Sequence, residues 1–303
     1  MADKAALENE IQVRQHASGA TPGWIPKVHQ GNQQGLRVKL GNRTSDCGKN
    51  GPWAKDFQHQ TQWALVAIPA PIYFVGKAAS LSQGEGFNMF IGHWAPAMVA
   101  ATHKDAPSLP VLFIAAQLVD WAFFLLLMVG AESMRITPGI SAMNPMDLYH
   151  MPYTHSLLGS AAWAAGFGAL IFAVSRNRNA AIIGALVVLS HWFLDLLVHV
   201  PDLTIAGGLP KLGLGLWNYP IVEMPLELLM TFGSLWVYAR KFKPNTTPLI
   251  TLGAVMLALQ AFNWLGPVEP DVTIGTSLLA LFAYGLVTLA SWWVHRSAML
   301  AKR

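Results

Sequence analysis

Long apolar segments alternate with short polar connections along most of this chain. From residue 89 onward, the apolar runs fall at about 89–102, 109–131, 154–174, 180–200, 220–239, 248–266 and 273–294. A helix needs about twenty apolar residues to cross the hydrocarbon core of a bilayer, and the first run is shorter than that. The pattern predicts an all-α, polytopic helical membrane bundle with about seven transmembrane helices, of which the first is tilted or partly re-entrant.

The beginning of the chain has a different character. Residues 1–61 are polar, are rich in Gln, Asn and Gly, and show neither a helical nor a strand period, which predicts a poorly structured extension. An apolar segment at 62–78 contains two prolines and a lysine and makes a marginal span at best. We divide the chain into an extension at 1–88 and a transmembrane domain at 89–303. Met89 would be a natural first residue, so a mis-assigned start would also explain the extension.

Composition and charge agree with a membrane protein. Hydrophobic residues make up 53% of the chain and charged residues only 12%, with a net charge of +4, which argues against a nucleic-acid partner and for membrane lipid. Basic residues gather in loops 175–179 and 240–247 and in the C-terminal tail. The positive-inside rule therefore predicts a multi-pass protein with a cytoplasmic C-terminus. The single cysteine, Cys47, excludes an intramolecular disulfide.

Ionisable residues lie inside segments that are predicted to cross the membrane. His191, Asp195 and His199 are spaced four residues apart in one such segment, so they share one face of a helix. Each charged side chain at the centre of a bilayer costs about 2.5–3.5 kcal/mol on insertion scales. A histidine and an aspartate one turn apart can both reach one metal ion, so the spacing predicts a metal site.

Polar residues of other predicted spans fall at the same depth under this topology, in the half of the bundle away from the cytoplasm. The predicted metal ligands are His93, Asp120, His155, His191 and Asp195. Nitrogen and oxygen ligands without a thiolate suit zinc best, with manganese and iron as alternatives. We expect auxiliary or second-shell roles for Gln117, His150, Thr154, Ser156, His199 and Asp202. The candidate catalytic carboxylates, which would take a proton from metal-bound water, are Glu223 and Glu227.

Several of these motifs resemble a known family. The triplet Thr154-His155-Ser156 at the start of a span, the His191-x-x-x-Asp195 pair and His93 in a Gly-His segment resemble bacterial membrane-bound, metal-dependent hydrolases, also described as LexA-binding inner-membrane-associated hydrolases. The resemblance covers about residues 89–240. It implies a location in the bacterial inner membrane, a divalent metal and hydrolase activity. The chain departs from the family in having Asp120 alone where a pair of acidic residues is usual.

Three functions are compatible with these features. The first is a metal-dependent hydrolase whose site opens to the non-cytoplasmic side and acts on a small-molecule or lipid-linked substrate, such as a lipid ester or phosphoester. The second is a permease that uses intramembrane His and Asp as ion or proton sites. The third is a non-catalytic structural membrane protein in which the polar cluster stabilises the bundle.

Overall fold

Six long apolar helices make up most of the structure. This computed structural model describes residues 90–267 and 271–300; the predicted extension at 1–88, with its segment at 62–78, lies outside the described residues. The six helices are α3 (Leu109–Met128), α4 (Leu157–Ser175), α5 (Arg178–Val198), α6 (Pro220–Phe242), α7 (Thr246–Leu265) and α8 (Ile274–Leu300). Each is long and apolar enough to cross a membrane, so the chain reads as a multi-pass membrane protein.

The first predicted span does not cross the bundle, so the described residues contain six of the seven predicted spans. Residues of that run form a single 3-10 turn, η2 (Ile91–His93), followed by a seven-residue helix, α2 (Trp94–Ala100). Seven residues rise about 10 Å, which is about a third of the hydrocarbon core. The short helix packs against α3, α5 and α6, and Trp94 and Met98 are fully buried. Burial inside the bundle, and not length, keeps this segment in place.

A short hairpin makes the prediction of an all-α fold incomplete. Strand β1 (Ser133–Ile136) pairs antiparallel with strand β2 (Met146–His150). Both strands lie in the loop that connects α3 to α4, and Arg135 of β1 forms an ion pair with Asp147 of β2 at 2.7 Å. Strands of four and five residues carry too little alternation for the sequence to reveal them against the strong helical pattern around them.

Helix α3 lies at the centre of the helical bundle, and α4 lies at its edge. α3 packs against α2, α5 and α8, and aromatic contacts join Trp94 of α2 to Phe113 of α3 and Tyr284 of α8. α4 packs mainly on α5 through Gly168 and Gly184, where an added Cβ would lie 3.1–3.2 Å from the facing helix. Small residues of this kind let membrane helices approach closely.

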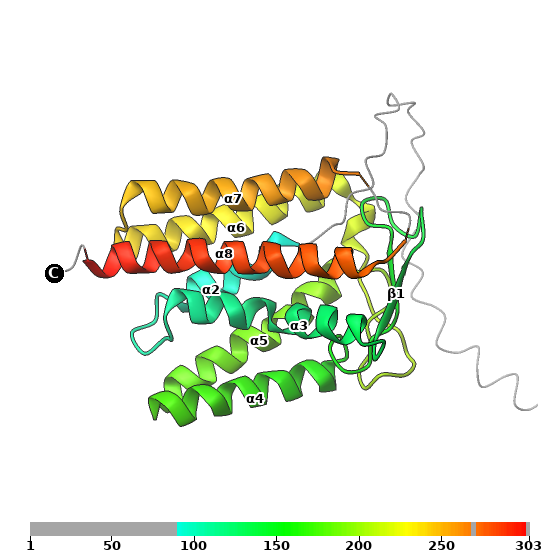
Figure 1. The fold of residues 1–303 in the computed structure, drawn as a ribbon, viewed down its shortest axis with the longest axis horizontal. Coiled ribbons are helices and arrows are strands. Elements are labelled where there is room, and N and C mark those ends of the chain that lie inside the picture. The colour runs from blue at the N-terminus through cyan, green and yellow to red at the C-terminus, as the bar shows by residue number, and fades with distance from the viewer. Residues whose placement is uncertain (1–89, 268–270, 301–303) are drawn as a thin grey trace, which may run out of the picture. The chain divides into compact units, whose positions relative to one another are not determined.

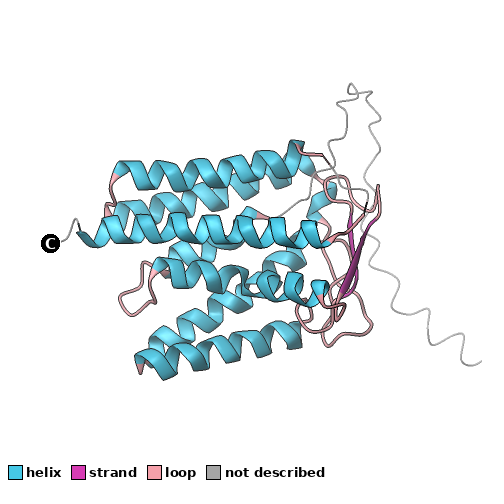
Figure 2. Ribbon diagram, in the orientation of Figure 1, coloured by secondary structure: helices cyan, strands magenta, loops and turns pink. Residues whose placement is uncertain are grey.

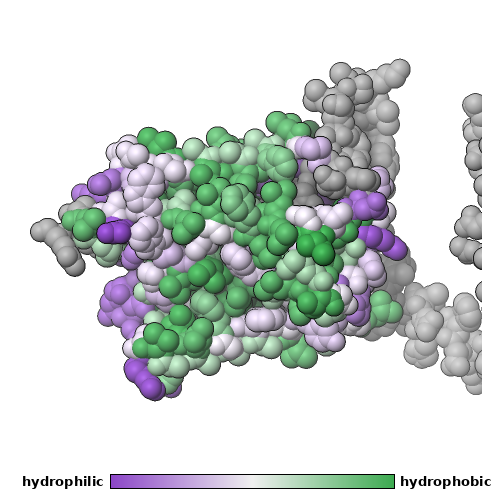
Figure 3. Space-filling model, viewed as in Figure 1, coloured by the Kyte–Doolittle hydropathy of each residue, from purple (hydrophilic) through white to green (hydrophobic). Residues whose placement is uncertain are grey.

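The outer surface of these helices is apolar between two polar ends. Figure 3 shows hydrophobic side chains along the helices and hydrophilic ones gathered at the ends. Large apolar side chains such as Leu170, Leu229 and Phe282 are exposed. Such a band is expected where lipid, and not water, surrounds the protein.

The two ends of the bundle differ in structure. The α2–α3, α4–α5 and α6–α7 connections lie at one end with the end of α8, while the hairpin and the loop before α6 lie at the other (Figure 1). Loops and strands gather at the hairpin end (Figure 2). The loop before α6 contains the 3-10 turn η3 (Leu216–Asn218). Arg176, Arg178, Lys241 and Lys243 all belong to the opposite end, which we call the basic end.

Candidate metal centre

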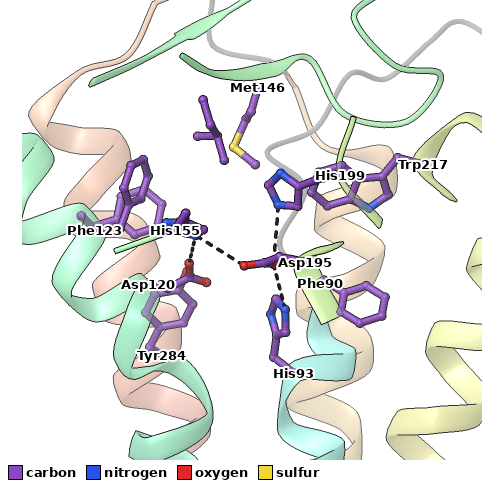
Figure 4. A pocket seen from close by; sticks show the side chains of 12 residues that line it. Phe90, His93, Asp120, Phe123, Met146, His155, Asp195, His199, Trp217 and Tyr284 are labelled. Carbon is purple, nitrogen blue, oxygen red and sulfur yellow. Dashed lines mark hydrogen bonds and ion pairs between the residues drawn. The ribbon is translucent and has the colours of Figure 1, made fainter. Parts of the chain in front are cut away.

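The five predicted metal ligands lie together inside the bundle, toward its hairpin end. His93 closes η2, Asp120 lies in α3, His155 precedes α4, and His191 and Asp195 lie one turn apart in α5. Figure 4 shows four of these side chains directed toward one another. The four other than Asp120 are buried, and the Asp120 side chain is 13% exposed. Residues separated by up to about a hundred positions thus form one polar cluster, which could hold a metal ion.

Several nitrogen and oxygen atoms of the cluster are spaced as the ligands of a metal ion are. His191 Nε2 lies 3.3 Å from Asp120 Oδ1 and 3.2 Å from Asp195 Oδ2. His155 Nε2 lies 3.3 Å from the same Asp120 oxygen and 3.7 Å from the same Asp195 oxygen. Ligands bound at about 2.0–2.1 Å in a tetrahedral zinc site lie about 3.3 Å from one another. Two overlapping sets of three residues could each hold an ion: Asp120, His155 and His191 form one, and His93, His191 and Asp195 form the other.

The other oxygen of Asp195 faces two further histidines. Asp195 Oδ1 lies 3.0 Å from His93 Nε2 and 3.5 Å from His199 Nε2. The His93 ring stacks on the His191 ring with centroids 3.9 Å apart. Asp195 therefore lies between two sets of imidazoles and contacts every histidine of the cluster.

Several of these atoms are buried without a hydrogen bond. Within the described residues, His93 Nε2, His191 Nε2 and Asp195 Oδ2 have no partner that meets hydrogen-bond geometry, although oppositely polar atoms lie close by. Buried polar atoms are normally paired. Ligand atoms around a metal ion direct their lone pairs at the ion and not at one another. The residues present therefore fit a divalent cation.

Neighbouring groups fix the orientation of the imidazole rings. His191 Nδ1 lies 2.8 Å from the backbone oxygen of Ala116, and His155 Nδ1 lies 2.8 Å from Thr154 Oγ1. A hydrogen bond from Nδ1–H leaves the lone pair of Nε2 to the cluster. Metal-binding histidines usually have such a partner on their second nitrogen.

Thr154 connects His155 to a carboxylate that the sequence did not single out. Its hydroxyl donates to Glu132 Oε2 at 2.6 Å, and the backbone N–H groups of Tyr153 and Thr154 donate to Glu132 Oε1. Glu132 is 1% exposed. It lies in the loop just after α3, where an acidic residue normally faces water, so its sequence position gave no sign of this role.

Two side chains donate hydrogen bonds to Asp120 Oδ2, the oxygen that does not face the histidines. Gln117 Nε2 lies 3.3 Å from Asp120 Oδ2, and the Tyr284 hydroxyl donates to the same atom at 3.0 Å. Gln117 was expected to assist from one turn earlier in the helix. Tyr284 was not expected, because a lone tyrosine in an apolar span is more often an ordinary packing residue.

His199 and Asp202, both predicted as auxiliary residues, form a pair beside the cluster. His199 follows the last residue of α5, and its Nδ1 lies 3.1 Å from Asp202 Oδ1. Burial lowers the pKa of His199, but the carboxylates of Asp202 and Asp195 outweigh this effect and raise the pKa to about 10. Without a metal, the nearby negative charge thus favours a proton on this imidazole.

A small cavity adjoins the cluster. Its volume is about 40 Å³, which gives room for one or a few waters. The polar wall comes from the cluster and from His199 and Tyr284, and the apolar wall consists of Phe90, Phe123, Phe124, Met146, Leu148 and Trp217. Met146 and Leu148 belong to strand β2, and Met146 lies over the cluster (Figure 4). The hairpin therefore separates the cluster from the end of the bundle.

Two predicted auxiliary residues, His150 and Ser156, lie outside the cavity lining. His150 ends β2 and is exposed. Ser156 is the N-cap of α4: its hydroxyl accepts from Gly159 N and donates to the backbone oxygen of Pro152. Ser156 thus fixes the start of the helix that follows His155, and its hydroxyl contacts no ligand directly.

The two predicted catalytic glutamates lie outside the cavity lining. Glu227 Oε1 accepts from the backbone N–H of Ile91 at 2.6 Å, and Oε2 accepts from Gln260 Nε2 at 2.6 Å. Glu223, one turn earlier in α6, is also buried. Glu227 therefore holds the start of η2 and connects it to α7. A role for either glutamate in proton transfer stays a prediction.

Comparison with protein-family models, with curated proteins and with solved structures finds no match for this chain. The geometry of the cluster is therefore the basis for inferring a function.

Proposed function

We propose that this protein is a metal-dependent hydrolase of the bacterial inner membrane, with a divalent metal, zinc first, at the cluster. The arrangement of His155, His191, Asp120 and Asp195, with histidine nitrogens 3.2–3.7 Å from the aspartate oxygens, carries the proposal. Two carboxylates in a buried setting also need positive charge nearby. A divalent ion supplies that charge while the imidazoles stay neutral. His93 is the fifth candidate ligand.

A metal ion bound there would lower the pKa of a coordinated water to about 7 and polarise a carbonyl or phosphoryl oxygen. The reaction is the addition of water to an ester or phosphoester. The water oxygen forms a bond to carbon or phosphorus, the bond to the leaving oxygen breaks, and a proton passes from the water to the leaving group. The cavity beside the cluster supplies the space for that water.

His199 is placed to carry the proton in this reaction. It lines the cavity, and Asp202 holds its Nδ1, so Nε2 faces the cluster. We add His199 to the glutamates predicted for this role, because His199 lines the cavity and Glu223 and Glu227 do not. Its partner Asp202 would stabilise the charged imidazole, as carboxylates do beside catalytic histidines.

The surroundings favour an apolar substrate. Aromatic side chains of Phe90, Phe123, Phe124 and Trp217 line the cavity, and the bundle has a lipid-facing surface. A lipid ester, phosphoester or lipid-linked compound fits this setting. A cavity of about 40 Å³ is too small for such a molecule, so the hairpin segment with Met146 and Leu148 has to move for a substrate to enter. The site would then open on the non-cytoplasmic side.

Metal content is the first test. The full chain, purified in detergent and reconstituted separately with zinc, manganese and iron, should contain about one ion per chain by mass spectrometry. His191→Ala and Asp195→Asn should lose it, and His150→Ala, a control that removes an exposed histidine at the same end, should keep it. If the wild type binds none of these metals, the proposal fails.

Hydrolysis is the second test, and it separates an enzyme from a structural metal protein. The cluster joins η2, α3, the start of α4 and α5, so a bound ion would also stabilise the bundle without turnover. A panel of ester and phosphoester substrates should be hydrolysed by the wild type, and His199→Gln should lower kcat while metal content stays unchanged. Bound metal without hydrolysis of any substrate would favour the structural role, and uptake into liposomes would favour the permease.

A further inference from the structure

A second and larger cavity lies at the basic end, far along the bundle from the cluster. Its volume is about 510 Å³, and it lies among the α2–α3 connection, the end of α6 and the end of α8. Its polar lining consists of Thr102, His103, Lys104, Ser108, Tyr238, Lys241 and His295. The proposed hydrolase activity leaves this cavity without a role.

The charge around this cavity is positive. Lys104 and Lys241 both line it and are exposed, and Arg240 and Lys243 flank Lys241 in sequence. Within the described residues of this end, Asp105 is the single acidic residue, and its carboxylate accepts a hydrogen bond from Asn179 Nδ2 at 2.9 Å. The cavity is therefore suited to an anion.

A buried hydroxyl without a partner points to a ligand. Tyr238 is 1% exposed and lines the cavity. Its ring packs on Phe242, with centroids 4.8 Å apart. In the part of the chain that the structure describes, its hydroxyl has no hydrogen-bond partner. Because buried hydroxyls are almost always paired, an acceptor on a bound molecule would complete this group.

The start of α3 also favours an anion in this cavity. Ser108 and Leu109, at the start of this 20-residue helix, line the cavity. The Ser108 side chain makes no capping hydrogen bond, so it does not occupy the N–H groups of Leu109 and Val111; Pro110 between them has none. The N-terminus of a long helix carries partial positive charge and favours phosphate groups.

We propose that this cavity binds the phosphate group of an anionic ligand, with Lys104 and Lys241 neutralising its charge and the Tyr238 hydroxyl donating to it. The basic end of a helical bundle lies near the membrane surface, where basic pockets between helices bind lipid head groups. Apolar lining residues, Leu109, Phe242 and Met299, suit the adjoining part of a lipid. A phosphorylated water-soluble compound offers the same chemistry and is the other source. The proposal is independent of the metal centre.

Native mass spectrometry of the delipidated full chain in detergent tests the proposal. Phosphatidylglycerol, phosphatidylcholine, inorganic phosphate and glycerol 3-phosphate would be titrated separately. The informative variant is Lys241→Gln, and its control is Lys243→Gln, which removes the same charge two residues later outside the cavity lining. We expect Lys241→Gln to weaken phosphatidylglycerol binding about fivefold and Lys243→Gln to change it less than twofold. Tyr238→Phe should weaken binding without lowering the melting temperature, because its hydroxyl has no partner to lose.

The result distinguishes the sources. Preference for phosphatidylglycerol over phosphatidylcholine and over both soluble phosphates supports a lipid headgroup. Binding of the soluble phosphates with the same dependence on Lys241 and Tyr238 supports the phosphate site and assigns it to a water-soluble ligand. Equal losses in Lys241→Gln and Lys243→Gln would overturn the proposal, because the attraction would then be general surface charge. Equal binding of the two lipids would also overturn it, because the net charge of the headgroup would then have no effect on binding.

Discussion

At the scale of single residues, the cluster depends on groups that orient the candidate ligands. His155, His191 and His199 each have a defined partner on Nδ1, which is Thr154, the backbone of Ala116 and Asp202 respectively. Each partner directs Nε2 toward the cluster. A polar network of this kind is expected where a metal is bound and is costly to bury where none is.

The Thr154 hydroxyl offers a sharp test of this orientation. Thr154→Val keeps the shape of the side chain but removes the link between His155 Nδ1 and Glu132. We expect metal affinity to fall about 10–100-fold, the usual effect of removing such a partner, as measured by competition with a metal chelator. Thr102→Val is the control, since that hydroxyl bonds only the backbone of Val99 among the described residues. Equal affinity in the two variants would exclude a role for Thr154.

At the scale of elements, the short segment of η2 and α2 determines the position of His93, a candidate metal ligand. η2 and α2 together are too short to be placed by the membrane, so side-chain contacts have to hold them. Glu227 of α6 accepts from the backbone of Ile91, two residues before His93, and Gln260 of α7 holds the other carboxylate oxygen. The position of His93 therefore depends on helices far away in the sequence.

Substitution of Glu227 tests this dependence. Glu227→Ala leaves the buried Ile91 N–H without its acceptor, which costs about 1–3 kcal/mol, and frees the segment that contains His93. We expect a lower melting temperature together with weaker metal binding. Glu227→Gln is the matched variant, because its amide oxygen still accepts from Ile91, and it should have a smaller effect on both. A wild-type metal affinity in Glu227→Ala would show that η2 keeps His93 in place unaided.

At the scale of the whole molecule, the helical bundle separates the candidate metal centre at the hairpin end from the basic cavity at the other end. Bound metal should stabilise the entire bundle, because the cluster joins four segments. A ligand at a hundred times its Kd adds about 2.7 kcal/mol to the free energy of unfolding. Removal of the metal with a chelator should therefore lower the melting temperature of the wild type by several degrees. His191→Ala, which should bind no metal, should show no change on the same treatment.

The orientation of the bundle can be tested independently of any activity. In a Cys47→Ser background, single cysteines would replace Asn245, in the α6–α7 connection, and Ala142, in the loop between β1 and β2. A membrane-impermeant maleimide added to intact cells should label Ala142→Cys but label Asn245→Cys only after permeabilisation, because the basic end is expected to face the cytoplasm. The reverse result would place the cluster on the cytoplasmic side.

The sequence predicted the six long helices well because an apolar run of sufficient length is itself the physical requirement for crossing a bilayer. It also pointed to His191 and Asp195, because four residues on a helix always share a face. The five candidate ligands could be chosen because ionisable groups at membrane depth are rare and costly. These features depend on composition and spacing along the chain, which folding does not change.

Tertiary structure alone decided the rest. The run at 89–102 contains only a seven-residue helix, which packs against α3, α5 and α6. Glu132 and Tyr284 joined the cluster from a loop and from the last helix, where nothing in their local sequence distinguishes them from surface or packing residues. Glu227 became the support of η2, while His150 and Ser156 came to lie elsewhere. A spacing rule relates residues within one helix, whereas contacts between helices depend on how all of the helices pack together.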